Sequence, residues 1–291
     1  MSKVAPHSEV LYDTLCFATV RPPGRRFVGH QKVMTIAEYE RAPDDRFEHG
    51  VLIVPLRSWG EFSKALAKLE PHADSFVWRG QRRDKDEDKT WLLKSLFDRG
   101  VRKGNRSALL KRHLDRFKKR MQQCHPGVSL KEDNDVWALG QHHGLKTALL
   151  DWTRSPYIAA YFAFQESHVN GDGKYRYVYG LSMTVRRRIT KPSKERFVEF
   201  IESLKYPSHR FSAQRSVLTR ALNGDDVETN IEWWSKRRPT YIVLVKFQIP
   251  VEERDKCLRE LHFMNINYES LLLDLRDVIS GCNDDLRNCS S

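Results

Sequence analysis

The sequence has no uninterrupted apolar run near the ~18 residues that a membrane-spanning helix needs. Its first residues, MSKVAPHSEV, lack the apolar segment of a secretory signal. The five cysteines are an odd number without a C-x-x-C spacing, and no set of about four suitably spaced zinc ligands is present. No repeat or low-complexity tract occurs. We therefore expect a cytoplasmic protein with reduced thiols, without a bound metal and without a membrane partner.

The composition is sufficient for a folded core. The 291 residues suit one large domain or two small ones, and 40% of them are hydrophobic and 11% aromatic. Strands are indicated at residues 51–55, 75–78, 175–183 and 241–249, and helices at 58–69, 91–97, 108–123, 135–140, 155–164, 193–205 and 252–264. Ser58 and Glu61 have the spacing of a capping box, and Ser155-Pro156 is a typical helix start. We expect an α+β fold with a mixed sheet in one domain.

Positive charge is in excess, because 50 lysines and arginines against 38 acids give a net charge of +12. This balance favours a polyanionic partner, nucleic acid first and an anionic membrane surface second. Residues 99–120 hold ten lysines and arginines and one acid, Asp115. We expect a basic helical insertion at about residues 99–125 that contacts phosphates, or else an ordinary helix with a solvated basic face. The candidate nucleic-acid contacts are Arg102, Lys103, Arg106, Lys111, Arg112, Lys118 and Lys119.

Residues 140–164, GQHHGLKTALLDWTRSPYIAAYFAF, place a dense set of polar side chains in a short loop before an apolar helix. Such chemistry on a loop held by a rigid scaffold is typical of binding and catalytic sites. His142 or His143 would act as a general base or donate a hydrogen bond to a ligand, or would fix the loop by bonding to backbone. Trp152 would stack on a base or a nicotinamide ring. Asp151 would bind a ribose hydroxyl or act as a base, or would only build a turn.

A second group of candidates stands upstream, at the end of the expected strand 75–78. Arg79 is placed there to donate two parallel hydrogen bonds to a phosphate or carboxylate. The alternative is that Arg79 pairs with a nearby acid and holds the sheet together. Gly80 leaves room for the backbone to approach a ligand closely. Arg210 and Gln214, four residues apart, form a weaker third group.

Taken in order, these motifs resemble the FRG-domain family, which is named for an aromatic-Arg-Gly motif. Trp78-Arg79-Gly80 stands at that motif, with Trp in place of the usual Phe or Tyr. Residues 140–163 match the family pattern GQHxGLPTRLLDWTxSPxxAxYFA, except that Lys146 replaces Pro and Ala148 replaces Arg.

Two later segments extend the resemblance. Residues 210–218 resemble RxxAQxGxF, with Ser216 where Gly is usual, and residues 271–277 resemble the family's closing LFPDLDG. The resemblance implies an N-terminal arm, an FRG domain that contains the basic insertion, and a tail, at residues 1–44, 45–280 and 281–291.

The layout is also similar to that of ADP-ribosyltransferases, which implies a mixed, split sheet flanked by helices and NAD as the cofactor. Arg79 would hold the NAD phosphates or ribose, and Thr153 and Ser155 would shape the nicotinamide pocket. Where these enzymes carry a glutamate, the chain has Gln214-Arg215-Ser216, so Asp151 or Glu269 would supply the charge. The implied catalytic residues are Arg79, Asp151 and Glu269, and the implied NAD-binding residues are Arg79, Gly80, Gln81, His142, Thr147, Trp152, Thr153, Ser155 and Gln214.

FRG-domain proteins further resemble toxins of bacterial anti-phage systems, among them a toxin–antitoxin–chaperone type whose toxin ADP-ribosylates mRNA. The resemblance implies an NAD-dependent transferase that modifies nucleic acid, mRNA first, and that an antitoxin neutralises with or without a chaperone. Two alternatives remain. One is a non-enzymatic nucleic-acid or nucleotide-binding module, and the other is an RNA-cleaving toxin built on Asp151 and His142 or His143.

Overall fold

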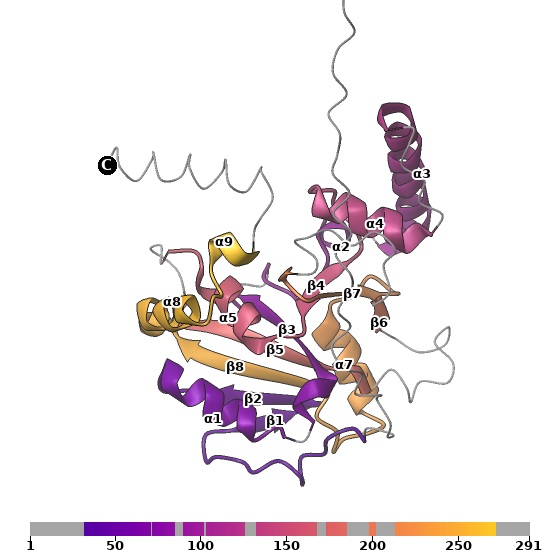
Figure 1. Cartoon of the computed structure of the whole chain (residues 1–291). Helices are drawn as coiled ribbons and strands as arrows, with labels where there is room; N and C mark the ends of the chain where they lie inside the picture. Colours follow the sequence, from indigo (N-terminus) through magenta and orange to yellow (C-terminus); the bar gives the residue numbers. More distant parts are fainter. Residues whose placement is uncertain are drawn as a thin grey trace, which may run out of the picture. The chain divides into compact units, whose positions relative to one another are not determined.

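The computed structural model describes residues 32–70, 72–84, 90–101, 103–125, 132–167, 173–184, 198–201 and 213–271. They belong to one compact unit that spans Gln31–Ser291. It combines helices with an eight-stranded mixed sheet, which confirms the predicted α+β class (Figure 1). Val33, Met34 and Tyr39 are already buried in the core, ahead of the expected domain start at residue 45. The expected tail lies outside the described residues.

The strands are β1 (Arg46–Glu48), β2 (Val51–Pro55), β3 (Phe76–Gln81), β4 (Leu150–Thr153), β5 (Tyr175–Ser182), β6 (Val198–Ile201), β7 (Ser216–Ala221) and β8 (Leu244–Pro250). Their order in the sheet is β1-β2-β8-β5-β3-β4-β7-β6. β2 and β8 are parallel, and the other neighbours are antiparallel. The parallel pair joins two strands that are far apart in the sequence.

The helices are α1 (Phe62–Ala67), α2 (Leu96–Gly100), α3 (Arg106–Cys124), α4 (Asp133–His142), α5 (Pro156–Phe164), α7 (Val227–Ser235), α8 (Arg254–Phe263) and α9 (Tyr268–Leu271). Single 3-10 turns lie at Trp59–Glu61, Ala73–Ser75, Lys103–Asn105 and Val251–Glu253. Within the described ranges, no helix is both long and apolar enough to pass through a bilayer.

Each face of the central strands is covered by its own apolar core. Trp78, Val178 and Phe247 point to one face, where they pack with side chains of α1, α5 and α8. Val77 and Tyr179 point to the other face and pack with side chains of α7. This alternation follows from the period of two in a strand, and it explains why the central strands are buried on both sides.

The sheet is nearly divided between β3 and β4. These strands are joined by one residue pair, Trp78↔Thr153, whereas β3 pairs with β5 along its whole length and β4 pairs with β7 along its whole length. We call this junction the seam. Beyond this one pair, the backbones of Arg79 in β3 and Asp151 in β4 are not paired with each other.

Helix α5 lies directly on β3. Ser155 begins it as predicted, because its Oγ accepts a hydrogen bond from Ile158 N at 3.3 Å and Pro156 takes the first helical position. Gly80 permits the close contact: a Cβ at this position would lie 1.9 Å from the carbonyl oxygen of Ala159. The space that a side chain would take at this glycine is therefore filled by helix backbone.

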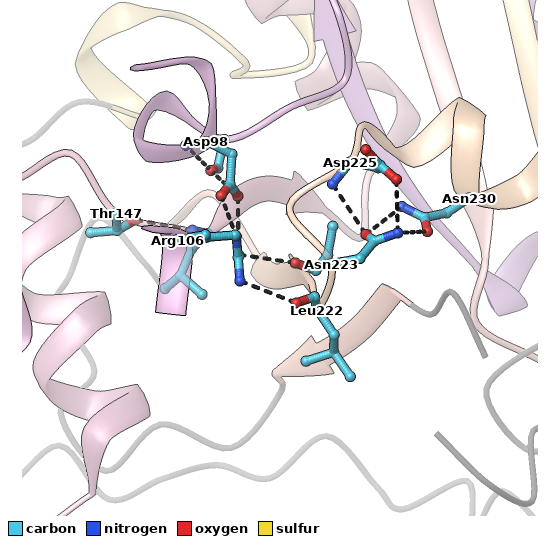
Figure 2. Close-up of polar contacts among 10 residues, drawn as sticks. Asp98, Arg106, Thr147, Leu222, Asn223, Asp225 and Asn230 are labelled. Atoms are coloured by element: carbon cyan, nitrogen blue, oxygen red, sulfur yellow. Dashed lines mark hydrogen bonds and ion pairs between the residues drawn. The ribbon is translucent and has the colours of Figure 1, made fainter. Parts of the chain in front are cut away.

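The basic helix α3 is fixed to the rest of the unit by Arg106 (Figure 2). Its Nε and Nη2 donate to Asp98 Oδ1 and Oδ2 at 2.6 and 3.2 Å. Its Nη1 and Nη2 donate to the carbonyl oxygens of Leu222 and Ala221, each at 3.1 Å. Gly224 leaves the space for this contact, because a Cβ there would lie 2.4 Å from Arg106 Nε. The predicted nucleic-acid contact of Arg106 is therefore wrong, since its buried guanidinium serves to anchor the helix.

Helix α7 was not predicted. Asp226 begins it by accepting a hydrogen bond from Thr229 N at 3.0 Å. The preceding turn is closed by Asn223, whose Nδ2 donates to Asp225 Oδ2 at 2.9 Å and to Asn230 Oδ1 at 3.0 Å (Figure 2). The sequence contains a helix start signal at Asp226, but the apolar side of this helix is short.

Several elements match the sequence expectations and others do not. The strands at 51–55 and 75–78 and the helix at 108–123 are present as β2, β3 and α3. The helix expected at 91–97 begins only at Leu96, because Ser95 Oγ accepts from Asp98 N at 3.1 Å and caps it there.

Three further expectations are corrected. Ser58 makes no side-chain cap bond, so the predicted capping box does not form. Within the helix expected at 193–205, the described residues Val198–Ile201 form β6, an edge strand paired with β7; the others lie outside the described residues. The loop expected from Gly140 onward is shorter than predicted, since α4 continues to His142 and β4 occupies Leu150–Thr153.

Candidate functional site

A cavity of about 310 Å³ lies at the seam. Strands β3, β4 and β7 and helices α4 and α5 contribute its lining, so the division of the sheet and the cavity coincide. The lining residues are Trp78, Arg79, Gly80, Ala138, Gln141, His142, Asp151, Trp152, Thr153, Ala159, Phe162, Gln165, Gln214, Ser216 and Leu218. The structure therefore brings together residues from all three of the motifs that the sequence singled out.

Arg79 places a partly buried positive charge at this cavity. Its Nη1 donates to the carbonyl oxygen of Asp151 at 2.8 Å across the seam, and its Nε donates to Gln81 Oε1 at 3.5 Å. Burial lowers the pKa of the Arg79 guanidinium, and the nearby charge of Asp151 acts in the opposite direction. Because an arginine stays protonated in proteins, the group remains a cation with five N–H donors.

Asp151 carries the carboxylate of the cavity. It lies in β4 and pairs with Leu218, so the turn interpretation is wrong. Its Oδ1 accepts a hydrogen bond from Gln141 Nε2 at 2.6 Å. The Thr147 hydroxyl donates to Gln141 Oε1 and accepts from Leu149 N at 3.2 Å. We call the series Thr147–Gln141–Asp151 the amide chain. Thr147 does not line the cavity, but its hydroxyl holds the side chain of Gln141.

The two adjacent histidines differ in position. His142 is the last residue of α4 and lines the cavity, whereas His143 follows the helix and is exposed. Their rings meet edge to face, with centroids 4.8 Å apart. Of the two, His142 is the one that a ligand in the cavity can reach.

Thr153 and Ser155 shape the passage from β4 to α5. The Thr153 hydroxyl oxygen accepts from Ser155 N at 3.1 Å, and Ser155 Oγ caps the helix. Thr153 lines the cavity, but Ser155 does not. Ser155 therefore acts by capping α5 and fixing the direction in which this helix leaves the seam.

Two predicted NAD-binding residues are held inside the protein. Trp152 is 2% exposed, packs in the core on the α7 face and donates from Nε1 to Thr219 Oγ1 at 2.8 Å. Its ring has no free face for the predicted stacking on a base or nicotinamide. Gln81 is 4% exposed, lies outside the lining and donates to the carbonyl oxygens of Trp91 and Arg83 at 3.1 and 3.3 Å.

The C-terminal side of the site is formed by Gln214, which lines the cavity. Its Nε2 donates to the carbonyl oxygen of Leu271 at 3.1 Å and so ties α9 to the start of β7. Glu269 belongs to α9 but is not part of the lining. Ser216 is part of it and has no carboxylate. Of the two carboxylates proposed from the sequence, Asp151 is the one that the structure brings to Arg79.

The polar face of α3 presents three of the predicted phosphate contacts to solvent, namely Lys111, Arg112 and Lys119. Lys118 instead pairs with Asp133 at the start of α4. Arg102 and the side chain of Lys103 lie outside the described residues. Leu114, Val136 and Trp137 form part of a small core between α3 and α4, so the basic helix is packed against the helix that carries Gln141 and His142.

The sequence did not assign a binding role to the lining residues Ala138, Gln141, Ala159, Phe162, Gln165 and Leu218. Gln141 carried a signal, because it directly precedes His142 in the polar stretch. Phe162 belongs to the same stretch but was assigned to an apolar helix without a polar side, and Gln165 directly follows that helix. Ala138 gave no local signal, and Leu218 ends the third motif without an assigned role, since only the tertiary fold brings α4 and β7 to this place.

Comparison with known proteins gives one match. Residues 74–172 match the family model of the FRG domain, which is about a third of the chain. The matched range contains β3, β4, α4 and α5, and with them Arg79, Gln141 and Asp151. No curated protein and no solved structure matches the chain.

Proposed function

We propose that this chain, through the FRG region at residues 74–172, is an NAD-dependent ADP-ribosyltransferase that modifies nucleic acid, with mRNA as the first expected substrate. The observation that supports it is that one cavity holds both the Arg79 guanidinium and the Asp151 carboxylate. The guanidinium can bind the diphosphate of NAD, and the carboxylate can stabilise the positive charge on the ribosyl centre. At about 310 Å³ the cavity is at the small end of ligand sites and suits the nicotinamide–ribose part of NAD.

In the proposed reaction, the bond between ribose C1′ and the nicotinamide nitrogen breaks, and nicotinamide leaves with the bonding electron pair. Asp151 stabilises the positive charge that develops on the ribose, while Arg79 holds the phosphates. A base amino group or a hydroxyl of the nucleic acid forms the new bond to C1′. The Asp151 carboxylate accepts the proton that this group releases.

The amide chain supports this role of Asp151. Gln141 Nε2 holds one carboxylate oxygen at 2.6 Å and leaves the other oxygen for the ribosyl centre. Groups that are already oriented stabilise a developing charge without reorganising during the reaction, which is the main source of electrostatic catalysis.

The nucleic acid that accepts the ADP-ribosyl group would bind at α3. Its exposed cations, Lys111, Arg112 and Lys119, neutralise phosphates, and α4 links this surface to the cavity. A toxin of this kind would be neutralised by an antitoxin, with or without a chaperone, as the resemblance to anti-phage toxins implies. An acidic antitoxin surface would complement the net charge of +12.

The test is transfer of label from radioactive NAD to RNA, DNA or protein, in separate reactions. We expect labelled RNA with the wild type, and at least about 100-fold slower labelling with Asp151→Asn, because a stabilising group in the transition state is lost. Arg79→Lys is expected to weaken NAD binding about tenfold, because lysine offers no planar fork.

Lys64→Ala is the matched control, since Lys64 is exposed on α1 and lines no part of the cavity. Its labelling rate should equal that of the wild type. The proposal is overturned when no acceptor is labelled, or when Asp151→Asn labels RNA as fast as the wild type.

Two alternatives have observations in their favour. Ser216 lacks the carboxylate that ADP-ribosyltransferases carry at that place, which favours a non-enzymatic nucleotide-binding module. His142 and Asp151 line the same cavity, which favours an RNA-cleaving toxin. NAD binding without nicotinamide release would select the first, and RNA cleavage without NAD would select the second.

A further inference from the structure

Helix α3 borders two depressions that share Arg112 and Arg116. One is open, has a volume of about 410 Å³ and runs along the basic face; its lining is Ala108, Lys111, Arg112, Asp115, Arg116 and Lys119. The other, of about 160 Å³, lies between α2 and α3, and we call it the niche; its lining is Phe97, Val101, Leu109, Arg112, His113 and Arg116. Two arginines thus separate a basic groove from a mainly apolar hollow.

The niche is held in shape by its own contacts. The His113 ring stacks on Phe97 with centroids 5.9 Å apart, and its Nε2 lies 3.0 Å from the carbonyl oxygen of Lys146. Phe97 is 7% exposed, while Val101 and Leu109 are partly exposed. The hollow therefore has apolar sides that remain in place without a ligand, which lowers the cost of ordering them on binding.

Its charge surroundings favour an anionic ligand. Arg112 and Arg116 are exposed at the niche, and Lys111 and Lys119 continue the positive charge along the groove. Asp115 is the one acid of the groove lining. An apolar hollow beside a row of cations matches a ligand with a flat apolar part attached to a phosphate chain.

We propose that the niche takes one unpaired base of single-stranded RNA, while the neighbouring phosphates lie on Lys111, Arg112, Arg116 and Lys119. The choice of RNA rests on the proposed function, but the binding itself requires neither NAD nor the cavity. Single-strand binders combine a positive groove for the backbone with apolar or aromatic platforms for the bases. The planar guanidinium groups of Arg112 and Arg116 add cation–π contacts to the base.

This arrangement selects single strands over duplexes. A base in a duplex is stacked and paired, and it would have to be extruded before it reached a hollow between two helices. In the duplex the phosphates still reach the basic groove, so binding is retained but weaker. The niche therefore adds base recognition to a helix whose sequence indicates only phosphate contacts.

The test compares three fluorescent oligomers of one length by anisotropy at a fixed salt concentration. They are single-stranded RNA of mixed sequence, the corresponding RNA duplex and an abasic ribose-phosphate chain. We expect the wild type to bind the single strand about tenfold more tightly than the other two, because a stacked base contributes about that factor.

The matched variants are Leu109→Lys and Lys119→Ala. In Leu109→Lys, the lysine stem fills the niche and its ammonium group extends to solvent. This variant should lose the preference for the single strand and keep its binding to the duplex. The second should weaken the binding of all three oligomers alike, and it should reduce the slope of log K against log salt concentration by about one. Leu109→Gln, which adds no charge, should lose the preference in the same way, and thermal unfolding of each variant shows that it is folded.

The inference is overturned by equal binding of the single strand and the abasic chain, or by a folded Leu109→Lys protein that keeps the preference. Since these measurements contain no NAD, a base preference without any ADP-ribosyl transfer would refute the proposed enzyme and support the niche.

Discussion

The amide of Gln141 is oriented by its neighbours at both ends. The Thr147 hydroxyl oxygen already accepts from Leu149 N, so its single hydrogen is directed to Gln141 Oε1. The NH₂ end must then point to Asp151 Oδ1, 2.6 Å away. The reverse orientation would bring the amide oxygen against the carboxylate, where two acceptors repel each other. Gln141 is thus a positioning residue for Asp151, fixed by a threonine outside the cavity.

Replacing Gln141 tests the amide chain. Gln141→Leu removes the donor, and Gln141→Glu keeps the size but sets a second carboxyl group against Asp151. Both should slow ADP-ribosyl transfer at saturating NAD by about 10- to 100-fold, because a hydrogen bond to a charged group contributes roughly 1.5–3 kcal/mol. In an Asp151→Asn background, Gln141→Leu should have no further effect on single-turnover rates. Fully additive losses would contradict a role that acts through Asp151.

Gly80 gives a prediction about stability. Gly80→Ala should lower the free energy of unfolding by at least about 1–3 kcal/mol, because its Cβ would overlap the Ala159 carbonyl oxygen and force α5 off β3. Gly100→Ala is the control: nothing lies within 4 Å of a Cβ there, so the change should be neutral or slightly stabilising. Urea unfolding of both variants measures the difference. Equal stabilities of the two variants would show that α5 can pack at a larger distance from β3.

Among the elements, α3 is attached by the buried ion pair between Arg106 and Asp98 in addition to its apolar contacts with α4. Arg106→Met leaves Asp98 charged and without its partner, and should destabilise the protein by about 3–5 kcal/mol. Lys118→Met removes the partly exposed pair with Asp133 on the same helix and should cost about 1 kcal/mol or less. Denaturant midpoints, with hydrogen exchange of α3, distinguish the two. Similar small losses for both would mean that the apolar contacts with α4 alone hold α3.

The elements that were predicted correctly are those whose signals are local. The helix at 108–123 follows from a stripe that includes Leu110, Leu114 and Phe117, and the start of α5 follows from Ser155-Pro156. β4 and β6, with four residues each, become strands by pairing with β7. Their short sequences do not reveal this partner, since pairing across such distances is decided by tertiary contacts.

At the scale of the whole molecule, the seam separates two groups of strands. β1, β2, β8, β5 and β3 lie on one side, and β4, β7 and β6 lie on the other. The Trp78↔Thr153 pair and the bond from Arg79 to the Asp151 carbonyl oxygen connect them. A ligand in the cavity contacts both groups, so its binding free energy also holds the two sides together.

Ligand binding should therefore stabilise both sides of the seam. ADP-ribose at about 100 times its Kd should raise the free energy of unfolding by about 2.7 kcal/mol. Hydrogen exchange should slow in β3 and in β4 together. Arg79→Lys should reduce both effects at the same ligand concentration. Protection confined to one side would contradict a site that spans the seam.

The site was predictable in its residue types and not in its assembly. Arg79, Asp151 and Gln214 were recognisable from their motifs, and the cavity unites them. The sequence did not reveal that Trp152 points into the core, because one residue of register decides which face of a strand a side chain takes. Nor did it separate Asp151 from Glu269, because the distance of each from Arg79 depends on how β4 and α9 pack.

The central position of β8 affects how the protein is made. Leu244–Pro250 pairs with both β2 and β5, yet it follows every residue of the cavity lining in the chain, the last of which is Leu218. On the ribosome, the complete set of lining residues therefore emerges before the strand that lies between β2 and β5. During that interval the edges of β2 and β5 are unpaired, and closing the long loop between β2 and β8 is slow. The nascent chain thus holds every residue of the cavity before it holds a finished sheet.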